Sequence, residues 1–166
     1  DSTIVGAEMA TIFNLVRGES GTTAKLLIQR KDEEKEIDVT RGSIRTFAVQ
    51  ATHMVDSITG YIKLRRFAEG AKDEVISGIV ALKNQGMQQL ILDLRDNGGG
   101  YLHEVIPMAE NLLSQGDLIM YTKGKRKTFD QSYIASKEGV FSKGKLALLI
   151  NEGSASASEV LSGAIQ

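Results

Sequence analysis

The stretch Leu90-Ile91-Leu92-Asp93-Leu94-Arg95-Asp96-Asn97-Gly98-Gly99-Gly100 decides the fold, because a compact apolar strand runs directly into a glycine-rich turn. The segment before it, 72–84, is amphipathic at helical spacing and is followed by Gly86, a pattern that predicts a helix. Gly60 to Arg66 predicts a strand before that helix. Strand, helix and strand in this order favour a right-handed parallel crossover, so we expect an α/β fold.

Further elements are expected on both sides of this unit. Toward the N-terminus the pattern predicts a helix over Ala7 to Arg17 that ends at a left-handed Gly18, and then a hairpin that closes near Gly42. The predicted strands on that side are Thr22–Arg30 and Glu36–Thr40, joined by a turn over 31–35, and then Phe47–Met54. Toward the C-terminus we expect a helix over Tyr101–Leu113 that tolerates Pro107 or is split by it, and then a strand over Asp117–Thr122. A long loop over Lys123–Lys143 with at most short strand pieces, an apolar strand over Leu146–Ile150, and a helix that begins near Ser154 or Ser156 should follow.

Composition excludes several classes of protein. The 166 residues carry a net charge of −1 with 42% apolar residues, so no overall attraction to nucleic acid or to an anionic membrane is expected. The longest apolar run, Leu146 to Ile150, is far shorter than the ~20 residues that span a bilayer. The absence of cysteine excludes disulfides, thiolate metal sites and cysteine nucleophiles.

Two turns are candidates for chemistry, because each joins the end of an apolar strand to the start of a helix, where α/β sheets place their ligands. We call 95–100 the glycine turn and 151–158 the serine turn. The glycines offer backbone N–H groups that can approach an anion closely, and the serine turn offers three hydroxyls at a strand-to-helix junction, where serine nucleophiles occur. Taken singly, the first is also typical of a sharp turn, and the second of helix capping and close packing.

Other motif matches fail. The segment from Gly139 to Leu146 has the glycine and lysine spacing of a phosphate loop, but it ends in leucine and precedes a strand. His103 and Glu104 begin a zinc-protease pattern, but Pro107 stands where the second histidine belongs. We therefore expect no metal and no cofactor.

Three segments, taken in order, resemble the carboxyl-terminal processing proteases, the serine peptidases of family S41. These segments are Gly60-Tyr61-Ile62-Lys63-Leu64 with Phe67, the stretch 90–100 quoted above, and Leu148-Leu149-Ile150-Asn151-Glu152-Gly153-Ser154-Ala155-Ser156-Ala157-Ser158-Glu159. Their order and spacing are jointly improbable by chance, although each motif alone is weak.

The resemblance implies a site and an architecture. Ser156 would be the nucleophile, and the backbone N–H groups of Gly99 and Ala157 would form the oxyanion hole. The expected fold is a crotonase/ClpP-like α/β protease core of strand–helix repeats over residues 43–166, truncated after the nucleophile helix. Residues 1–42 look like the C-terminal half of a PDZ-like domain, a helix plus a β-hairpin.

One departure from the family concerns the general base. Family members use a serine–lysine dyad whose lysine lies well beyond the nucleophile, whereas every lysine of this sequence precedes Ser156. We therefore expect the 166 residues to be part of a longer protease or a chain that has lost its base, and to be inactive or nearly so as given.

The implied activity is that of a serine endopeptidase that cleaves protein substrates near their C-termini through an acyl-enzyme on Ser156. A non-catalytic peptide-binding or scaffolding protein of the same fold is the main alternative, and an acyl-CoA enzyme of the crotonase fold is a third. Expected partners are protein or peptide substrates and no nucleic acid, with self-association left open. Family habit implies an extracytoplasmic location in the bacterial cell envelope.

Overall fold

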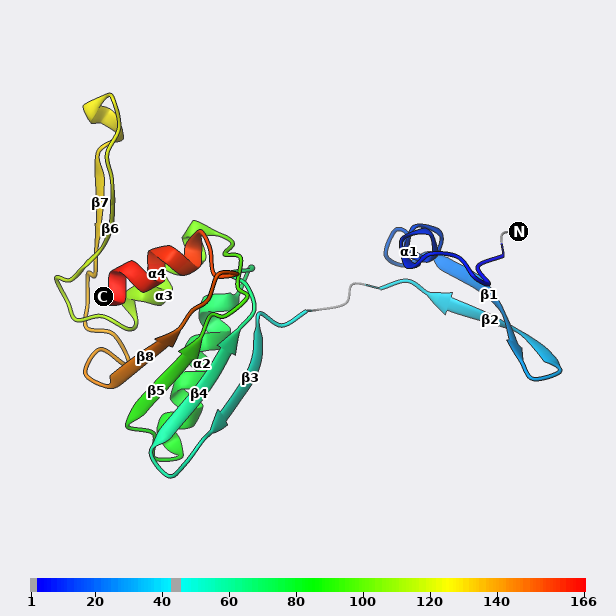
Figure 1. The fold of residues 1–166 in the computed structure, drawn as a ribbon, viewed down its shortest axis with the longest axis horizontal. Coiled ribbons are helices and arrows are strands. Elements are labelled where there is room, and N and C mark those ends of the chain that lie inside the picture. The colour runs from blue at the N-terminus through cyan, green and yellow to red at the C-terminus, as the bar shows by residue number, and fades with distance from the viewer. Residues whose placement is uncertain (1–2, 43–45) are drawn as a thin grey trace. The chain divides into compact units, whose positions relative to one another are not determined.

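The computed structural model describes residues 3–42 and 46–166, which form two compact units, Asp1–Thr46 and Phe47–Gln166 (Figure 1). The unit boundary lies close to the predicted one between residues 42 and 43, although residues 43–45 themselves lie outside the described residues. The identification of the first unit as part of a PDZ domain stays a prediction.

The first unit consists of helix α1 (Met9–Val16) and an antiparallel hairpin of β1 (Thr23–Arg30) and β2 (Glu33–Thr40). The helix and hairpin were predicted, but two details of the prediction were wrong. Helix α1 ends at an extended Arg17, and no left-handed Gly18 caps it. The turn is tighter than expected, because Lys31 adopts φ 57° and lets Arg30 pair directly with Glu33.

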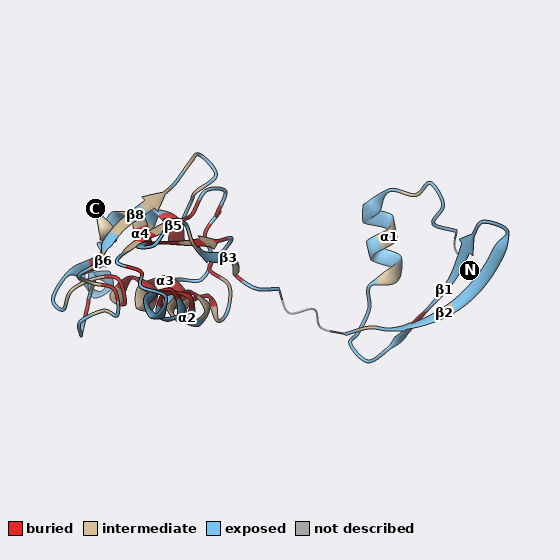
Figure 2. Cartoon of the chain, turned by 90° about the horizontal axis from the view of Figure 1, so that it is seen from below, coloured by how far each residue is buried: buried red, intermediate tan, exposed pale blue. Residues whose placement is uncertain are grey.

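This unit buries little apolar surface. Ala24 is the one buried residue among the described residues of the unit, and helix α1 has none. Met9, Phe13 and Leu27 are each at least 45% exposed. A single helix and a two-stranded hairpin do not enclose a core, and Figure 2 accordingly shows this unit almost entirely as exposed surface.

The second unit is built on a four-stranded sheet of order β3-β4-β5-β8. Strand β3 (Val49–Met54) is antiparallel to β4 (Thr59–Leu64), whereas β4, β5 (Gln89–Asp93) and β8 (Lys145–Leu149) are parallel. Helix α2 (Ala71–Asn84) connects β4 to β5 and packs against β3 and β4. The predicted parallel crossover is therefore confirmed.

The core of this unit lies between the sheet and its helices. Inward residues of β4 and β5 are fully or almost fully buried, as is one face of α2, namely Ile62, Leu64, Leu90, Leu92, Val75, Ile79 and Leu82. Helix α3 (Leu102–Glu110) packs beside α2 and α4 (Ala157–Ile165) and adds Val105 and Met108 to the core (Figure 2).

Helix α3 contains Pro107 without being split. Its buried Glu104 accepts hydrogen bonds from the backbone N–H groups of Gly70 (2.9 Å) and Lys72 (2.7 Å) at the start of α2. One carboxylate thereby satisfies two unpaired donors of the neighbouring helix terminus.

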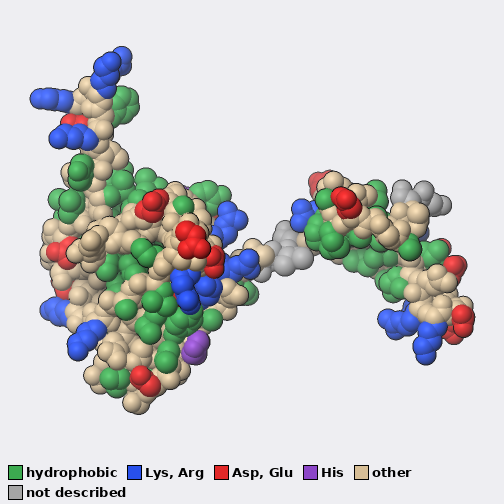
Figure 3. Space-filling view, in the orientation of Figure 1, with side chains coloured by type: hydrophobic (Ala, Val, Ile, Leu, Met, Phe, Trp, Pro, Cys, Tyr) green, Lys and Arg blue, Asp and Glu red, His purple; other side chains and the backbone are tan. Residues whose placement is uncertain are grey.

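The predicted long loop contains short regular elements, as the prediction allowed. Strand β6 (Leu118–Thr122) pairs with β7 (Gln131–Ile134), and a short 3₁₀ helix (Lys127–Phe129) lies between them. The hairpin projects from the unit (Figure 1), and Lys and Arg side chains gather at its tip (Figure 3). Residues 123–127, which include three lysines and one arginine, are all exposed.

Candidate active site

The glycine turn and the serine turn lie side by side. They follow β5 and β8, which are adjacent parallel strands with Leu92 opposite Leu148, so both turns leave the same edge of the sheet. The sequence predicted two strand-to-helix turns, and the strand order explains why they meet. Strand β8 is only half-buried, although its sequence is apolar.

Direct hydrogen bonds fix the two turns to each other. The side-chain amide of Asn151 donates to Asp96 Oδ1 (2.8 Å), and its Oδ1 accepts from the Asp96 N–H (2.8 Å). The Ser154 hydroxyl donates to the Leu94 carbonyl (2.7 Å), so the first serine of the serine turn has a structural role.

Asn97 is the centre of this connection. It is fully buried, and its carbonyl accepts from the Ala155 N–H (3.1 Å) and from the Ser158 hydroxyl (2.8 Å). Its side-chain amide donates to the Leu64 carbonyl at the end of β4 (2.9 Å). Sequence reasoning treated Asn97 only as a turn residue, although an Asn two residues before a glycine is a signal for a side chain that closes a turn.

Ser156 is the exposed middle serine and precedes helix α4 directly. Its backbone adopts φ 55° and ψ −111°, a conformation that is strained for any residue with a Cβ. Serine nucleophiles at strand-to-helix junctions occupy sharp, strained turns of this kind, because such a turn exposes the hydroxyl. The Glu159 carboxylate accepts from the Ser156 N–H at 2.6 Å and supports the turn.

Gly99 lies against Ser156. With φ 97°, it adopts a backbone conformation that favours glycine, and a Cβ at this position would lie 2.8 Å from the Ala155 carbonyl oxygen and 2.8 Å from Ser156 Cβ. The same Cβ would lie 2.9 Å from the backbone nitrogen of Ala157. The structure therefore brings the three predicted site residues, Ser156, Gly99 and Ala157, together in one contact.

The two predicted oxyanion donors differ in whether their N–H groups are already hydrogen-bonded. The Ala157 N–H donates to no acceptor in the described part of the chain. The Gly99 N–H instead donates to the side-chain oxygen of Asn97 at 2.9 Å. An anion that binds here would have to share or replace this hydrogen bond.

Buried charge supports the start of the glycine turn. Asp93 is fully buried at the end of β5 and accepts from Arg95 Nη2 (2.7 Å) and from the Tyr61 hydroxyl (2.6 Å). The hydrogen bond from Arg95 is the main reason that the pKa of Asp93 lies well below its usual range, and it outweighs the effect of burial. Desolvation, followed by the hydrogen bond to Asp93, raises the pKa of Tyr61.

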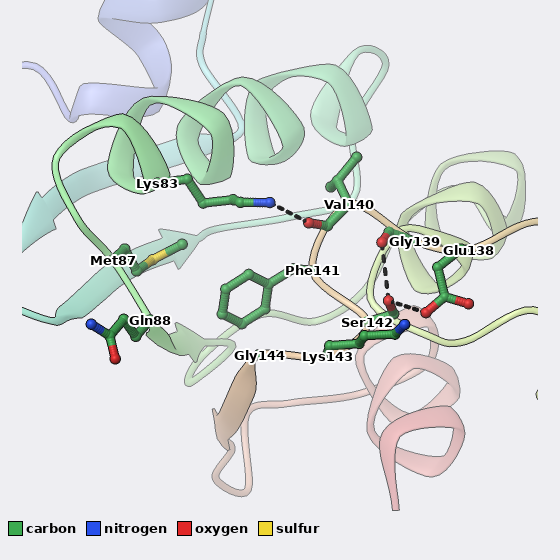
Figure 4. A pocket seen from close by; sticks show the side chains of 10 residues that line it. All are labelled: Lys83, Met87, Gln88, Glu138, Gly139, Val140, Phe141, Ser142, Lys143 and Gly144. Carbon is green, nitrogen blue, oxygen red and sulfur yellow. Dashed lines mark hydrogen bonds between the residues drawn. The ribbon is translucent and has the colours of Figure 1, made fainter.

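Two hollows of about 360 Å³ each lie in the second unit. One borders the glycine turn and is lined by Arg66 and Gly98 to Gly100. The other lies between the end of α2 and the loop 138–144, where Lys83 Nζ donates to the Val140 carbonyl (Figure 4). Residues 139–144 of the rejected phosphate-loop match line this second hollow, and the match continues into strand β8.

A group of metal-ligating side chains within the described residues consists of Glu69, His103 and Glu104, whose ligand atoms lie within 4.8 Å of one another. Both oxygens of Glu104 are already occupied by backbone N–H groups. The remaining pair, His103 Nε2 and Glu69 Oε2 at 3.1 Å, is exposed. The start of helix α2, which Glu104 caps, and a surface hydrogen bond between His103 and Glu69 account for this grouping.

Comparison with known proteins gives a consistent result. The model of the family "Peptidase family S41" matches residues 58–166. Two proteins described as a "probable CtpA-like serine protease" are similar to this chain: that of Staphylococcus epidermidis strain RP62A is 34% identical over 168 positions, and that of Staphylococcus haemolyticus is 36% identical over 165 positions.

Each alignment covers 98% of this chain and 33% or 32% of the relative, so the chain spans about a third of the length of these relatives. Among solved structures, the photosystem II D1 C-terminal processing protease matches with a TM-score of 0.63 and 25% identity, over 96% of this chain and 45% of that one. No helix of the described residues is long and apolar enough to cross a bilayer.

Proposed function

The chain belongs to peptidase family S41, and from this premise we propose that it carries the nucleophile half of a serine endopeptidase site with Ser156 as the attacking residue. The contact between the strained Ser156 and the glycine turn is the observation that carries the proposal. It joins an exposed hydroxyl to backbone N–H groups at a helix start, which is the arrangement that acyl transfer requires.

In this mechanism the Ser156 hydroxyl attacks the scissile carbonyl, and the oxygen of the tetrahedral intermediate accepts from the N–H groups of Ala157 and Gly99. The Ala157 donor is available at once, because it has no acceptor among the described residues. The Gly99 donor is released when the developing anion displaces Asn97 Oδ1, because a charged acceptor forms the stronger hydrogen bond.

A general base must remove the Ser156 proton. Within the described residues no lysine is hydrogen-bonded to Ser156, and Lys63 of β4 lies with its Nζ 3.6 Å from Asp93 Oδ2. We propose that a lysine outside residues 1–166 is the base, so that the printed chain alone has little or no turnover.

The proposed substrates are proteins cleaved near their C-termini, and an extracytoplasmic location belongs to the same proposal. Similarity to the D1 C-terminal processing protease supports this substrate class. Peptide binding without catalysis is the second candidate, and it is favoured by the Gly99 N–H, which is already satisfied by Asn97.

The test uses the protein extended past Gln166, incubated with unfolded protein substrates whose new C-termini are read by mass spectrometry. We expect cleavage by the unchanged protein and none by Ser156→Ala. Ser154→Ala should keep its turnover per folded molecule. Equal turnover in Ser156→Ala and the unchanged protein would exclude Ser156 as nucleophile. Binding of the substrates without cleavage by either would leave the second candidate.

A further inference from the structure

The hollow beside the glycine turn is lined by Arg66 on one side and by the backbone of Gly98 to Gly100 on the other. Arg66 follows strand β4, and the adjoining Phe67 pairs with the glycine turn, its N–H donating to the Gly99 carbonyl (3.0 Å) and its carbonyl accepting from the Tyr101 N–H (2.8 Å). This pairing fixes the backbone of 66–67 along the glycine turn and sets Arg66 at the border of the hollow.

The Arg66 side chain is exposed and forms no hydrogen bond, ion pair or ring contact with any residue that the structure describes. In contrast, Arg95, also near this edge of the sheet, is paired with the buried Asp93. Arg66 therefore adds an uncompensated positive charge to the hollow.

The backbone wall adds free donors. The N–H groups of Gly98 and Gly100 donate to no acceptor among the described residues. A Cβ placed on Gly98 would meet no atom within 4 Å, so this glycine opens onto free space. A guanidinium and unoccupied backbone N–H groups at one hollow are donors that suit a carboxylate.

We propose that this hollow is a carboxylate subsite of the peptide-binding cleft, with Arg66 as the residue that selects the charge. Its assignment to the substrate rests on the proposed function, whereas the binding of a carboxylate does not. Gly99 lines the hollow and also contacts Ser156, so the subsite begins beside the nucleophile.

The position limits which carboxylate can reach it. One residue of extended peptide spans about 3.3–3.6 Å, so a carboxylate in the hollow belongs to a residue within about one or two positions of the scissile bond. That carboxylate is either the α-carboxylate of a chain end, which makes the enzyme release very short C-terminal pieces, or an Asp or Glu side chain, which makes it select acidic sequences.

The test is an NMR titration of the isotopically labelled 166-residue chain, following the amide signals of Gly98 and Gly100. The probes are three N-acetylated tetrapeptides: tetra-alanine with a free C-terminus, tetra-alanine with a C-terminal amide, and an amidated peptide in which one Ala is Glu. We expect at least one carboxylate probe to bind about fivefold or more tightly than amidated tetra-alanine. Which of the two does so identifies the source of the carboxylate.

Arg66→Gln should remove this preference, whereas Arg65→Gln should retain it, because Arg65 is also exposed but does not line the hollow. Signals of α2 that are unchanged in both variants show that the fold is intact. Equal affinity for all three probes, or an unchanged preference in Arg66→Gln, would overturn the proposal. Labelling of Ser156 by a fluorophosphonate in the extended protein tests the proposed function separately, since it needs no carboxylate binding.

Discussion

At the scale of single residues, the backbone of the exposed Ser156 is held in a conformation that costs free energy. Because glycine adopts this region readily, Ser156→Gly should be more stable than Ser156→Ala by about 1 kcal/mol, although both lose the nucleophile. Urea unfolding of the two variants measures this difference. A less stable Ser156→Gly would mean that the turn is not strained.

Asp93 is the second residue with a testable energetic role. Its lowered pKa means that the folded state favours the ionised carboxylate, so this contribution to stability is present above the ordinary carboxyl pKa of about 4 and is lost as pH falls toward the lowered folded value. Asp93→Asn should lower the free energy of unfolding by about 1–3 kcal/mol at pH 7. The loss is limited because the Arg95 side chain is half-exposed, so water solvates its charge in the variant.

Urea unfolding of the unchanged chain and of Asp93→Asn at about pH 7 and pH 3 measures this effect, with the expected difference narrowing at the lower pH. An equal difference in the free energy of unfolding at both pH values would indicate that the substitution acts through the shape of the side chain and not through its charge.

At the scale of elements, the two turns act as one structural unit because Gly99 allows them to touch. Gly99→Ala combines a positive φ with a Cβ 2.8 Å from a backbone oxygen, so it should cost roughly 3 kcal/mol and displace the turns. Gly98→Ala is the matched control, since its Cβ would have nothing within 4 Å and Gly98 has no positive φ. Thermal unfolding compares them, and equal losses would contradict the packing argument.

Asn97 joins three elements, since its hydrogen bonds reach β4, the glycine turn and the serine turn. Asn97→Ala removes the side-chain partner of the buried Leu64 carbonyl and should cost about 2 kcal/mol or more. It also frees the Gly99 N–H. If that group is an oxyanion donor, Asn97→Ala in the extended protein should lower the free energy of unfolding but have a smaller effect on the rate per folded molecule. Active-site titration combined with kinetics measures that rate.

The elements also show what the sequence could predict. Local patterns were enough for the strands and helices around the glycine turn, because apolar periodicity and glycine placement act over few residues. The three site residues could be chosen only through the ordered motifs, and their contact depends on β5 and β8 being neighbours, which local pattern does not specify. The role of Asn97 was missed because it depends on burial between three segments distant in sequence.

At the end of α1 the structure differs from the prediction. Gly18 was expected to cap α1, but that helix ends in an extended Arg17 whose N–H donates to the Phe13 carbonyl. Residues 131–134 form β7 because β6 offers an edge to pair with, and β7 is one of the short strand pieces that the prediction for 123–143 allowed.

At the scale of the whole molecule, the two units differ in how much core they have. Residues 1–46 expose Met9, Phe13 and Leu27 and bury little among the described residues, whereas residues 47–166 contain a continuous buried cluster. Expressed separately, 47–166 should unfold cooperatively in urea, while 1–46 should show the circular dichroism and narrow amide dispersion of an unfolded chain. A cooperative transition in the shorter piece would show that its hairpin and helix are sufficient for stability.

The central claim is that Ser156 is a nucleophile whose base lies outside these residues. The measurement that tests it most directly is reaction with a fluorophosphonate probe, applied to the 166-residue chain and to a form extended past Gln166, with the modified residue identified by mass spectrometry. We expect labelling at Ser156 in the extended form, and little or none in the shorter chain. Labelling at another residue, or an extended and folded protein that is not labelled at all, would contradict it.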